Sequence, residues 1–346
     1  MGRAIVFNGD GTWERREVPV PDPQPGGAVL RVEATGLCHS DVDQFNGVAR
    51  TPRGGAFPVI PGHEIVGRVE KIDPSAAKEW GVEEGDRVAV RTIVINSEGS
   101  RAYGIDFPLR DGGGSGLHGG YADYMEVLPG SALHRLRDDL PAAELTIFEA
   151  LSCSVTWVRP IKEGETVVIE GPGHMGLASV VAARAVGAGT VIVTGLSRDR
   201  ARLDCALRVG ADHVIDVETE NAGERVAEIT GGRMADVVID AASGSPATVN
   251  VAMGLVGNGG RIVVAGIKDH PLDGLDTNAI PFRGITIQPG AGLDVARAVE
   301  LINEGRVPTA ELAGETFSLD DFEDAFALLD RMVPGRDAVR VSLRLS

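Results

Sequence analysis

The chain has 346 residues, of which 43% are hydrophobic, and its formal net charge at pH 7 is -17. A single hydrophobic core stops growing near about 250–300 residues, so this length predicts two domains. Nucleic acids and anionic membranes bind clusters of basic residues, and a strongly acidic chain repels them. The composition therefore excludes nucleic-acid and membrane partners and favours a small-molecule ligand.

The beginning of the chain and its cysteines indicate a cytoplasmic protein. Residues Met1–Phe7 run directly into the polar Asn8-Gly9-Asp10 and lack the apolar core of a signal peptide. No apolar run approaches the roughly 18 residues that a membrane-spanning helix needs. The cysteines are too few and too widely spaced for a disulfide framework or a four-cysteine zinc knuckle, so a metal would need mixed ligands.

The first part of the chain reads as an all-β unit. Short runs rich in Val and Ile, separated by Pro/Gly turns, predict strands. These strands lie at Ala4–Phe7, Ala28–Ala34, Gly67–Ile72, Arg87–Val90 and Tyr121–Val127. The Gly- and Ser-rich segment Asn96–Gly120 is long for a loop without secondary structure, which indicates a functional or mobile segment.

From Thr166 the chain alternates apolar strands with Ala-, Leu- and Arg-rich helical stretches. The predicted strands are Thr166–Glu170, Thr190–Thr194, His213–Ile215, Asp236–Asp240, Arg261–Ala265 and Ile285–Gln288. Six strands with helices between them make a complete doubly wound parallel sheet. The tail adds helices at Leu293–Glu304 and Leu319–Met332 and a strand at Ala338–Leu345, which we expect to return to the β unit.

A glycine-rich turn follows the first of these parallel strands. Gly171, Gly173 and Gly176 have the G-x-G-x-x-G spacing, which permits a tight turn, a close approach of pyrophosphate and close helix packing. His174 and Met175 open the helix that follows, whose free N–H groups attract phosphates. The alternative is an ordinary strand–helix turn, but the flanking strand and helix favour a dinucleotide site.

Two segments of the β unit carry possible metal ligands. Cys38 lies in Gly36–Asp41 and His63 lies in Pro61–Glu64, both beside glycines. Catalytic zinc takes three protein ligands from Cys, His and carboxylate, and these two residues with a third would fit. The alternatives are a small buried cysteine and a histidine in a turn.

Several segments, in this order, resemble the zinc-dependent medium-chain dehydrogenases/reductases, with the sorbitol and threonine dehydrogenase branch most similar. They are Cys38-His39-Ser40-Asp41, Gly62-His63-Glu64-Ile65-Val66-Gly67, Gly85-Asp86-Arg87-Val88, Gly119-Gly120-Tyr121-Ala122-Asp123-Tyr124 and the turn at Gly171. The resemblance implies an α/β protein with a GroES-like β catalytic domain over residues 1–155, completed by 292–346. A doubly wound parallel Rossmann domain would occupy residues 156–291.

The resemblance also assigns the metal ligands. Cys38 and His63 match the first two catalytic zinc ligands, and Glu64 matches the carboxylate beside the metal. Glu149 matches the third ligand of this branch, with Cys153 as its rival. The region Val94–Leu117 lacks the cysteines that bind a second zinc in many relatives, so we expect one catalytic zinc and no structural zinc.

Three further residues follow the ligand cysteine closely. Ser40 matches the first member of a proton relay, but Asp43 stands where relatives often have the relay histidine. His39 occupies a place where relatives often have a basic residue near the cofactor pyrophosphate, and a simple surface histidine is the alternative.

The end of the second parallel strand bears on the choice of nicotinamide cofactor. NAD enzymes usually place an acid there to bind the ribose hydroxyls. This chain has Gly195, Ser197 and Arg198 instead, which leave room for a 2′-phosphate and can bind it. NADP is therefore favoured over NAD, and Asp199 keeps NAD as the alternative.

Together these features predict a zinc-dependent oxidoreductase that transfers a hydride between an alcohol or carbonyl substrate and NADP(H) or NAD(H). The alternatives are a zinc-free quinone or enone reductase of the same superfamily and a non-catalytic dinucleotide-binding protein. Relatives commonly form dimers or tetramers through the last Rossmann strand. We therefore expect a homodimer or homotetramer, with Arg283–Pro289 at its interface.

Overall fold

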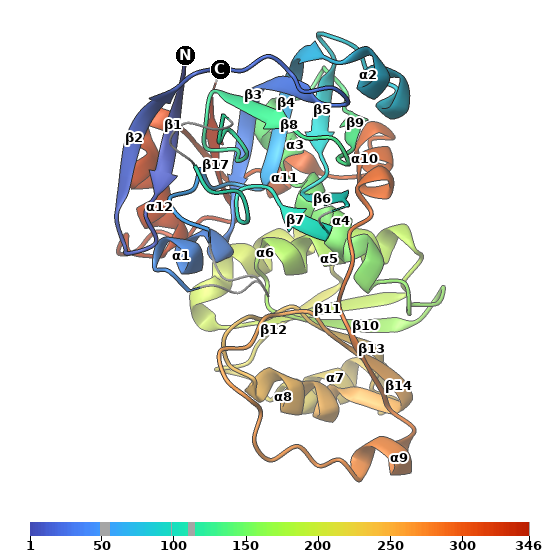
Figure 1. Ribbon diagram of the computed structural model, residues 1–346. Helices are drawn as coiled ribbons and strands as arrows, with labels where there is room; N and C mark the ends of the chain where they lie inside the picture. The colour runs from blue at the N-terminus through green and yellow to red at the C-terminus, as the bar shows by residue number, and fades with distance from the viewer. Residues whose placement is uncertain (49–55, 98, 110–114, 346) are drawn as a thin grey trace. The chain divides into compact units, whose positions relative to one another are not determined.

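A computed structural model describes residues 1–48, 56–97, 99–109 and 115–345 (Figure 1). The chain divides into two compact units. Unit 1 comprises residues 1–149, 299–305 and 313–346, and unit 2 comprises residues 150–298 and 306–312. The domain boundaries predicted at 155/156 and 291/292 lie near these divisions, and they remain predictions for the functional domains.

The core of unit 1 is a mostly antiparallel seven-stranded sheet. Its order is β16-β17-β3-β4-β5-β9, and β8 pairs with β3. The strands are β16 (Glu315–Ser318), β17 (Val341–Arg344), β3 (Ala28–Leu37), β4 (Glu64–Ile72), β5 (Arg87–Val90), β9 (Leu133–Arg135) and β8 (Tyr124–Val127). The predicted strands are present, and β3 and β4 extend beyond their predicted ends toward Leu37 and Glu64. These extensions place candidate ligands at strand ends.

Two hairpins and several helices complete unit 1. The hairpins are β1 (Gly2–Phe7) with β2 (Trp13–Val18), and β6 (Ile93–Asn96) with β7 (Gly99–Ala102). The helices are α1 (His39–Phe45), α2 (Pro74–Trp80), α3 (Ala142–Leu145) and α12 (Phe322–Leu329). The division between the units falls within α4 (Phe148–Trp157) and α10 (Val295–Asn303).

The described part of the segment Asn96–Gly120 contains regular and buried structure, and its expected functional or mobile character stays a prediction. β7 lies there, and Tyr103 is fully buried with its hydroxyl 2.5 Å from Ser131 Oγ and accepting a hydrogen bond from the Leu128 amide. The Phe107 ring stacks on Tyr103 at 5.5 Å. Gly and Ser content concealed this buried aromatic pair. Residues 98 and 110–114 of the segment lie outside the described residues.

Unit 2 contains the predicted doubly wound parallel sheet. Its order is β12-β11-β10-β13-β14-β15, and every neighbouring pair is parallel. The strands are β10 (Thr166–Glu170), β11 (Thr190–Gly195), β12 (His213–Asp216), β13 (Ala235–Asp240), β14 (Val256–Val264) and β15 (Thr286–Pro289). Strand order reverses beside β10, which defines the switch point where such sheets bind ligands.

Helices cover both faces of this sheet, so its strands read as continuous apolar runs. In Figure 1, α5 and α6 lie on one face, and α7 and α8 lie on the other. Their bounds are α5 (His174–Ala185), α6 (Arg200–Arg208), α7 (Ala222–Thr230) and α8 (Ala247–Leu255), and the short α9 (Ala279–Arg283) and α11 (Thr309–Leu312) belong to the same unit. Val168 and Ile192 at the sheet centre are fully buried.

The tail adds β16 and β17 to the sheet of unit 1 instead of extending the parallel sheet. The single helix predicted over Leu319–Met332 is shorter than expected. A 3₁₀ turn occupies Leu319–Asp321, and α12 ends at Leu329, just before Arg331 with its positive φ of 56°. Within the described residues, no helix has both the length and the apolar character that crossing a bilayer requires.

Candidate functional site

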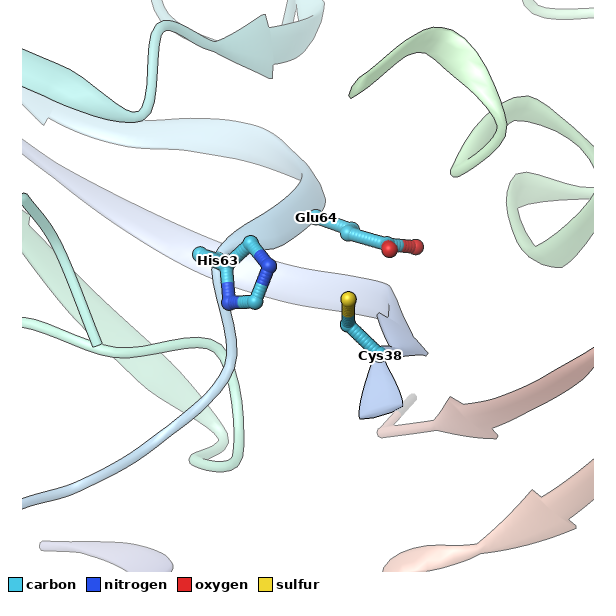
Figure 2. A group of neighbouring side chains, drawn as sticks. All are labelled: Cys38, His63 and Glu64. Atoms are coloured by element: carbon cyan, nitrogen blue, oxygen red, sulfur yellow. The ribbon is translucent and has the colours of Figure 1, made fainter. Parts of the chain in front are cut away.

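Three predicted metal-site residues converge in unit 1. Cys38 immediately precedes α1, His63 immediately precedes β4, and Glu64 is the first residue of β4. One potential ligand atom from each lies within 4.8 Å of the other two, and Figure 2 shows the three side chains facing a common space. A thiolate, an imidazole and a carboxylate are ligands that zinc binds well. Among the described residues, these three alone form such a group.

Asp41 organises this cluster from a buried position, and the sequence analysis gave it no role. Its Oδ2 accepts a hydrogen bond of 2.9 Å from the Cys38 amide and one of 2.7 Å from the Tyr121 hydroxyl. Its Oδ1 lies 3.5 Å from His63 Nδ1. A carboxylate on one imidazole nitrogen orients the ring and leaves the other nitrogen for a metal. His63 Nε2 is therefore the candidate ligand atom.

Glu64 forms a buried ion pair with Arg340, which immediately precedes β17 and was also missed. The exposed fractions of their side chains are 0% and 1%, and an Arg340 Nη2–Glu64 Oε2 hydrogen bond joins them. Gly36, the β3 partner of Glu64, makes room for this pair. A Cβ at Gly36 would lie 1.8 Å from Glu64 Oε2, so a side chain cannot be accommodated there without displacing the pair.

The protonation of His63 reflects its anionic neighbours. Burial of the ring favours its neutral form, but the Asp41 carboxylate and the Cys38 thiol group outweigh burial and raise the pKa of His63 well above its usual value. The site without metal thus attracts positive charge. A divalent cation would replace that proton, because a metal-ligating histidine is neutral.

The other residues predicted for this site are distributed around it. Glu149 is buried in the first turn of α4 and lies outside the group formed by Cys38, His63 and Glu64. Ser40 and Asp43 are half-buried, and their separation of three residues places them on one face of α1. Their roles, and the exposed His39 as a cofactor contact, remain predictions.

The glycine turn of unit 2 has the geometry that its spacing predicts. Gly171 has a φ of 94°, a left-handed conformation that favours glycine, and its amide donates to Thr194 O at 3.0 Å. Gly173 caps α5, and a Cβ there would meet no atom within 4 Å. A Cβ at Gly176 would lie 1.9 Å from Gly171 O. His174 and Met175 form the first turn of α5, where backbone N–H groups can bind phosphate.

The end of β11 has acidic neighbours that the sequence analysis did not consider. Gly195 is buried, and Ser197 and Arg198 are exposed in a short 3₁₀ turn. The Ser197 hydroxyl donates to Asp216 Oδ2 at 2.7 Å, and the Ser197 amide donates to Glu218 Oε2 at 2.8 Å. Asp216 is the register partner of Gly195 on β12, and Glu218 follows the end of β12 by two residues, so the neighbouring strand and the turn after it supply the acids that β11 lacks.

Asp41 and Arg340 were not predicted as site residues, and they differ in whether the sequence contains a signal for their roles. Asp41 follows Cys38 by three residues, the spacing of a capping interaction, so its contact with the Cys38 amide had a local signal. Arg340 lies in a tail segment with no motif. Its role depends on the pairing of β17 with β3, which a single sequence does not reveal.

Two family models match this chain. One, described as "Alcohol dehydrogenase GroES-like domain", matches residues 24–138, and the other, described as "Zinc-binding dehydrogenase", matches residues 175–303. Together they span both units and include Cys38, His63, Glu64 and the last glycine of the turn.

Full-length relatives agree with these models. The chain is 34% identical to a probable alcohol dehydrogenase of Mycobacterium tuberculosis, covering 97% of this chain and 96% of that protein. It is 32% identical to an erythritol/L-threitol dehydrogenase of Mycolicibacterium smegmatis, covering 99% and 97%. A solved zinc-binding dehydrogenase of Sinorhizobium meliloti, bound to NADP, is 26% identical with a TM-score of 0.85 and 99% coverage of both chains.

Proposed function

The chain belongs to the zinc-type medium-chain dehydrogenase/reductase family, and from that membership we propose that Cys38 and His63 carry its chemistry. The reaction is the oxidation of an alcohol, or the reverse reduction of a carbonyl, with a nicotinamide cofactor. The supporting observation is the convergence of Cys38, His63 and Glu64 to within 4.8 Å around a site that Asp41 organises. A zinc-free quinone reductase or a non-catalytic binding protein would need no such ligand set.

The residues around the site have separate roles in this reaction. Bound zinc would supply a Lewis acid that stabilises negative charge on the substrate oxygen. Asp41 holds the His63 ring, and Arg340 holds Glu64 beside the ligand pair with its charge neutralised. Oxidation removes a hydride from the carbinol carbon to the nicotinamide and a proton from the hydroxyl. Ser40, with Asp43 one turn further along α1, conducts that proton outward.

The third protein ligand is Glu149 in this proposal. It is a buried carboxylate at the start of a helix, where a negative charge is favoured by the helix dipole. Glu64, already paired with Arg340, would then remain beside the metal instead of binding it permanently. The rival ligand Cys153 lies in the part of α4 that belongs to unit 2. Replacing each of them separately by Ala and measuring zinc content distinguishes the two.

The cofactor is a nicotinamide dinucleotide held by Gly171, Gly173, His174, Met175 and Gly176. The absence of an acid on β11 and the presence of Arg198 support NADP. Asp216 and Glu218, which bind Ser197, support NAD as the second candidate because two carboxylates repel a 2′-phosphate.

A comparison of cofactors decides between NADP and NAD. If NADP is the cofactor, Arg198→Ala lowers its kcat/KM at least about tenfold, the loss of one charge-assisted contact, and leaves NAD nearly unchanged. If NAD is the cofactor, the wild type prefers NAD, and Asp216→Asn with Glu218→Gln raises kcat/KM for NADP. Initial rates with both cofactors and one alcohol substrate provide this measurement.

The substrate class is alcohols, including polyols, and the protein assembles as a homodimer or homotetramer. The named relatives include an alcohol and a tetritol dehydrogenase. β15 ends the parallel sheet, and Phe282, on α9 just before β15 in the chain, is 87% exposed, so this part of unit 2 offers both backbone groups and an apolar side chain to a second copy. A panel of primary and secondary alcohols and polyols, followed by nicotinamide absorbance, identifies the substrate.

Replacing Cys38 by Ser tests the proposed function. Loss of the thiolate removes metal-assisted charge stabilisation worth several kcal/mol, so kcat/KM falls by about 10³-fold or more. Elemental analysis of the same preparation should show less than stoichiometric zinc. Binding of reduced cofactor, followed by its fluorescence, stays close to the wild-type affinity.

Cys205, which is buried on α6 in unit 2, offers a matched control. Cys205→Ser keeps both zinc and turnover. A Cys38→Ser variant that retains turnover within tenfold of the wild type would refute the role assigned to Cys38, and joint loss of zinc and cofactor binding would indicate a structural metal.

A further inference from the structure

A second buried polar cluster lies in unit 2, at the carboxyl edge of its sheet. Glu170 ends β10, Asp240 ends β13, and the two residues are register partners on neighbouring parallel strands. β10 and β13 flank the point where strand order reverses, which is where doubly wound sheets bind dinucleotides. Gly171, the first residue of the glycine turn, follows Glu170 directly. An ionisable residue therefore directly precedes the turn that is predicted to bind the pyrophosphate.

Among the described residues, Lys268 is the only lysine near this cluster, and its ammonium group is already paired with Asp240. Lys268 Nζ lies 2.8 Å from Asp240 Oδ2 and donates to Ala242 O and Thr248 Oγ1 as well. These acceptors use all three ammonium protons. Glu170 is only 3% exposed, and its Oε2 is buried without a hydrogen-bond partner. The cluster thus holds two carboxylates with one fully engaged cation.

This arrangement disfavours the charged form of Glu170. Burial is the largest cause, the neighbouring Asp240 carboxylate adds to it, and the Lys268 charge opposes both; the pKa of Glu170 is raised to about 9. Among the other packed elements, α5 brings His174 near the end of β10. Thr194 on β11 and the residues of α8 bring no titratable group. Near neutral pH, Glu170 carries a proton.

We propose that Glu170 is a positioning residue for the cofactor. The pyrophosphate of the dinucleotide binds at the glycine turn only when the carboxyl group of Glu170 is neutral. This inference rests on the proposed function, because it assumes that the glycine turn binds a dinucleotide. A neutral acid can donate a hydrogen bond at this edge, whereas a carboxylate there adds a negative charge beside a pyrophosphate in a poorly solvated site. Loss of the Glu170 proton therefore sets an alkaline limit on cofactor binding.

Linkage makes the proposal measurable. If the protonated form binds the cofactor better, then bound cofactor must in turn favour the protonated form. Near the pH at which Glu170 titrates, cofactor binding takes up a proton from solution. At neutral pH, where Glu170 is already protonated, it takes up none through this group.

The experiment measures the Kd of the zinc-loaded enzyme for the reduced cofactor between pH 7 and pH 10, by nicotinamide fluorescence. In the wild type, Kd rises above about pH 9, approaching tenfold per pH unit, as expected when one proton is required. Glu170→Gln imitates the neutral acid and removes this alkaline rise. Calorimetry in two buffers of different ionisation enthalpy shows proton uptake near pH 9 for the wild type and none through this group for Glu170→Gln.

Two other variants keep the test decisive if Glu170→Gln folds poorly. Asp240→Asn removes the neighbouring charge and releases Lys268, so Glu170 ionises more easily and the alkaline rise begins at lower pH. Glu165→Gln alters a carboxylate just before the opposite end of β10, paired with Arg261 at 2.7 Å, and keeps the wild-type pH profile.

The outcomes separate this inference from the proposed function. A wild type that fails to bind reduced cofactor at any pH overturns the proposed function. Cofactor binding with the same pH profile in wild type and Glu170→Gln overturns the role of Glu170 and leaves the proposed function standing. An Asp240→Asn profile that does not move also contradicts the inference.

Discussion

Glu64 and Glu170 are both buried at the end of a strand, one in each unit, yet their neighbours give them opposite electrostatic surroundings. Glu64 faces the guanidinium of Arg340, which β17 brings beside β4 through β3. Glu170 faces a second carboxylate, Asp240, whose lysine is already engaged. The first glutamate lies next to candidate metal ligands, and the second directly precedes the glycine turn that is predicted to bind phosphate.

The difference shows that the partner, more than burial itself, decides what a buried carboxyl group can do. A carboxylate with its own guanidinium can stay charged in the interior. A carboxyl group that is buried beside another carboxylate keeps its proton to higher pH instead. A charged carboxylate favours a nearby cation, and a neutral carboxyl group tolerates a nearby anion. Glu64 therefore suits the predicted metal of unit 1, and Glu170 suits the predicted pyrophosphate of unit 2.

The largest effect at a single pH near neutrality is expected when Glu64 loses its guanidinium. Arg340→Met leaves a buried charge without its main compensation, which costs about 3–5 kcal/mol in the free energy of unfolding. Urea denaturation followed by circular dichroism measures this loss. The double variant Arg340→Met with Glu64→Gln should recover most of it, because neither charge is then buried. A single variant within about 1 kcal/mol of the wild type would mean that the pair behaves like a surface salt bridge.

On the other side of the comparison, Glu170 should make stability depend on pH. An unfolded glutamate has a pKa of about 4.3, and Glu170 has a folded pKa of about 9, so the folded state holds an extra proton between these values. The free energy of unfolding then falls as pH rises through this window, by at most about 1.4 kcal/mol per pH unit. The advantage of Glu170→Gln over the wild type therefore grows from about pH 5 to about pH 9 and is constant above that range.

Urea unfolding of both proteins at several pH values measures this trend. An advantage of equal size at acid and alkaline pH would show that Glu170 titrates normally in the folded protein. Glu165→Gln serves as the comparison, because the pKa of Glu165 is lowered, with burial opposing and Arg261 favouring its charged form.

The smallest of the three effects concerns the orientation of a ligand. Asp41→Asn preserves the shape of the side chain but removes the negative charge beside His63. Changes at such supporting residues typically reduce metal affinity about 10–100-fold. Competition with a chromophoric zinc chelator measures the affinity, and Asp43→Asn on the same helix should leave zinc affinity unchanged. Unchanged affinity in Asp41→Asn would mean that the 3.5 Å approach to His63 Nδ1 does not support the metal site.

The local pattern of the chain predicted most of the fold. Arg87–Val90 and Thr166–Glu170 have the same bounds in the sequence analysis and in the structure, because each is a compact strand bounded by turn residues. No strand was predicted at β2, because its four consecutive charged residues hide the alternation of apolar and polar residues that indicates a strand. These residues are Glu14, Arg15, Arg16 and Glu17. The backbone hydrogen bonds of this polar strand are made with β1, and composition alone does not predict that pairing.

The candidate site was predictable only where its residues formed motifs. Cys38, His63 and Glu64 lie in short glycine-flanked segments, and the structure brings them together. Arg340 and Asp240 act through strand register, which depends on the pairing of distant segments. The acids near Ser197 illustrate the same limit, because they come from β12 and the turn after it, and not from the end of β11.

The contacts of Asp41 also offer a way to observe the site without turnover. The Cys38 amide proton is donated to Asp41, so the same bond that begins α1 fixes the ligand cysteine. Its exchange with solvent deuterium requires local opening of that turn. Slow exchange of this one amide would report an assembled site, and its acceleration after chelation would measure how strongly the metal holds the first turn of the helix closed.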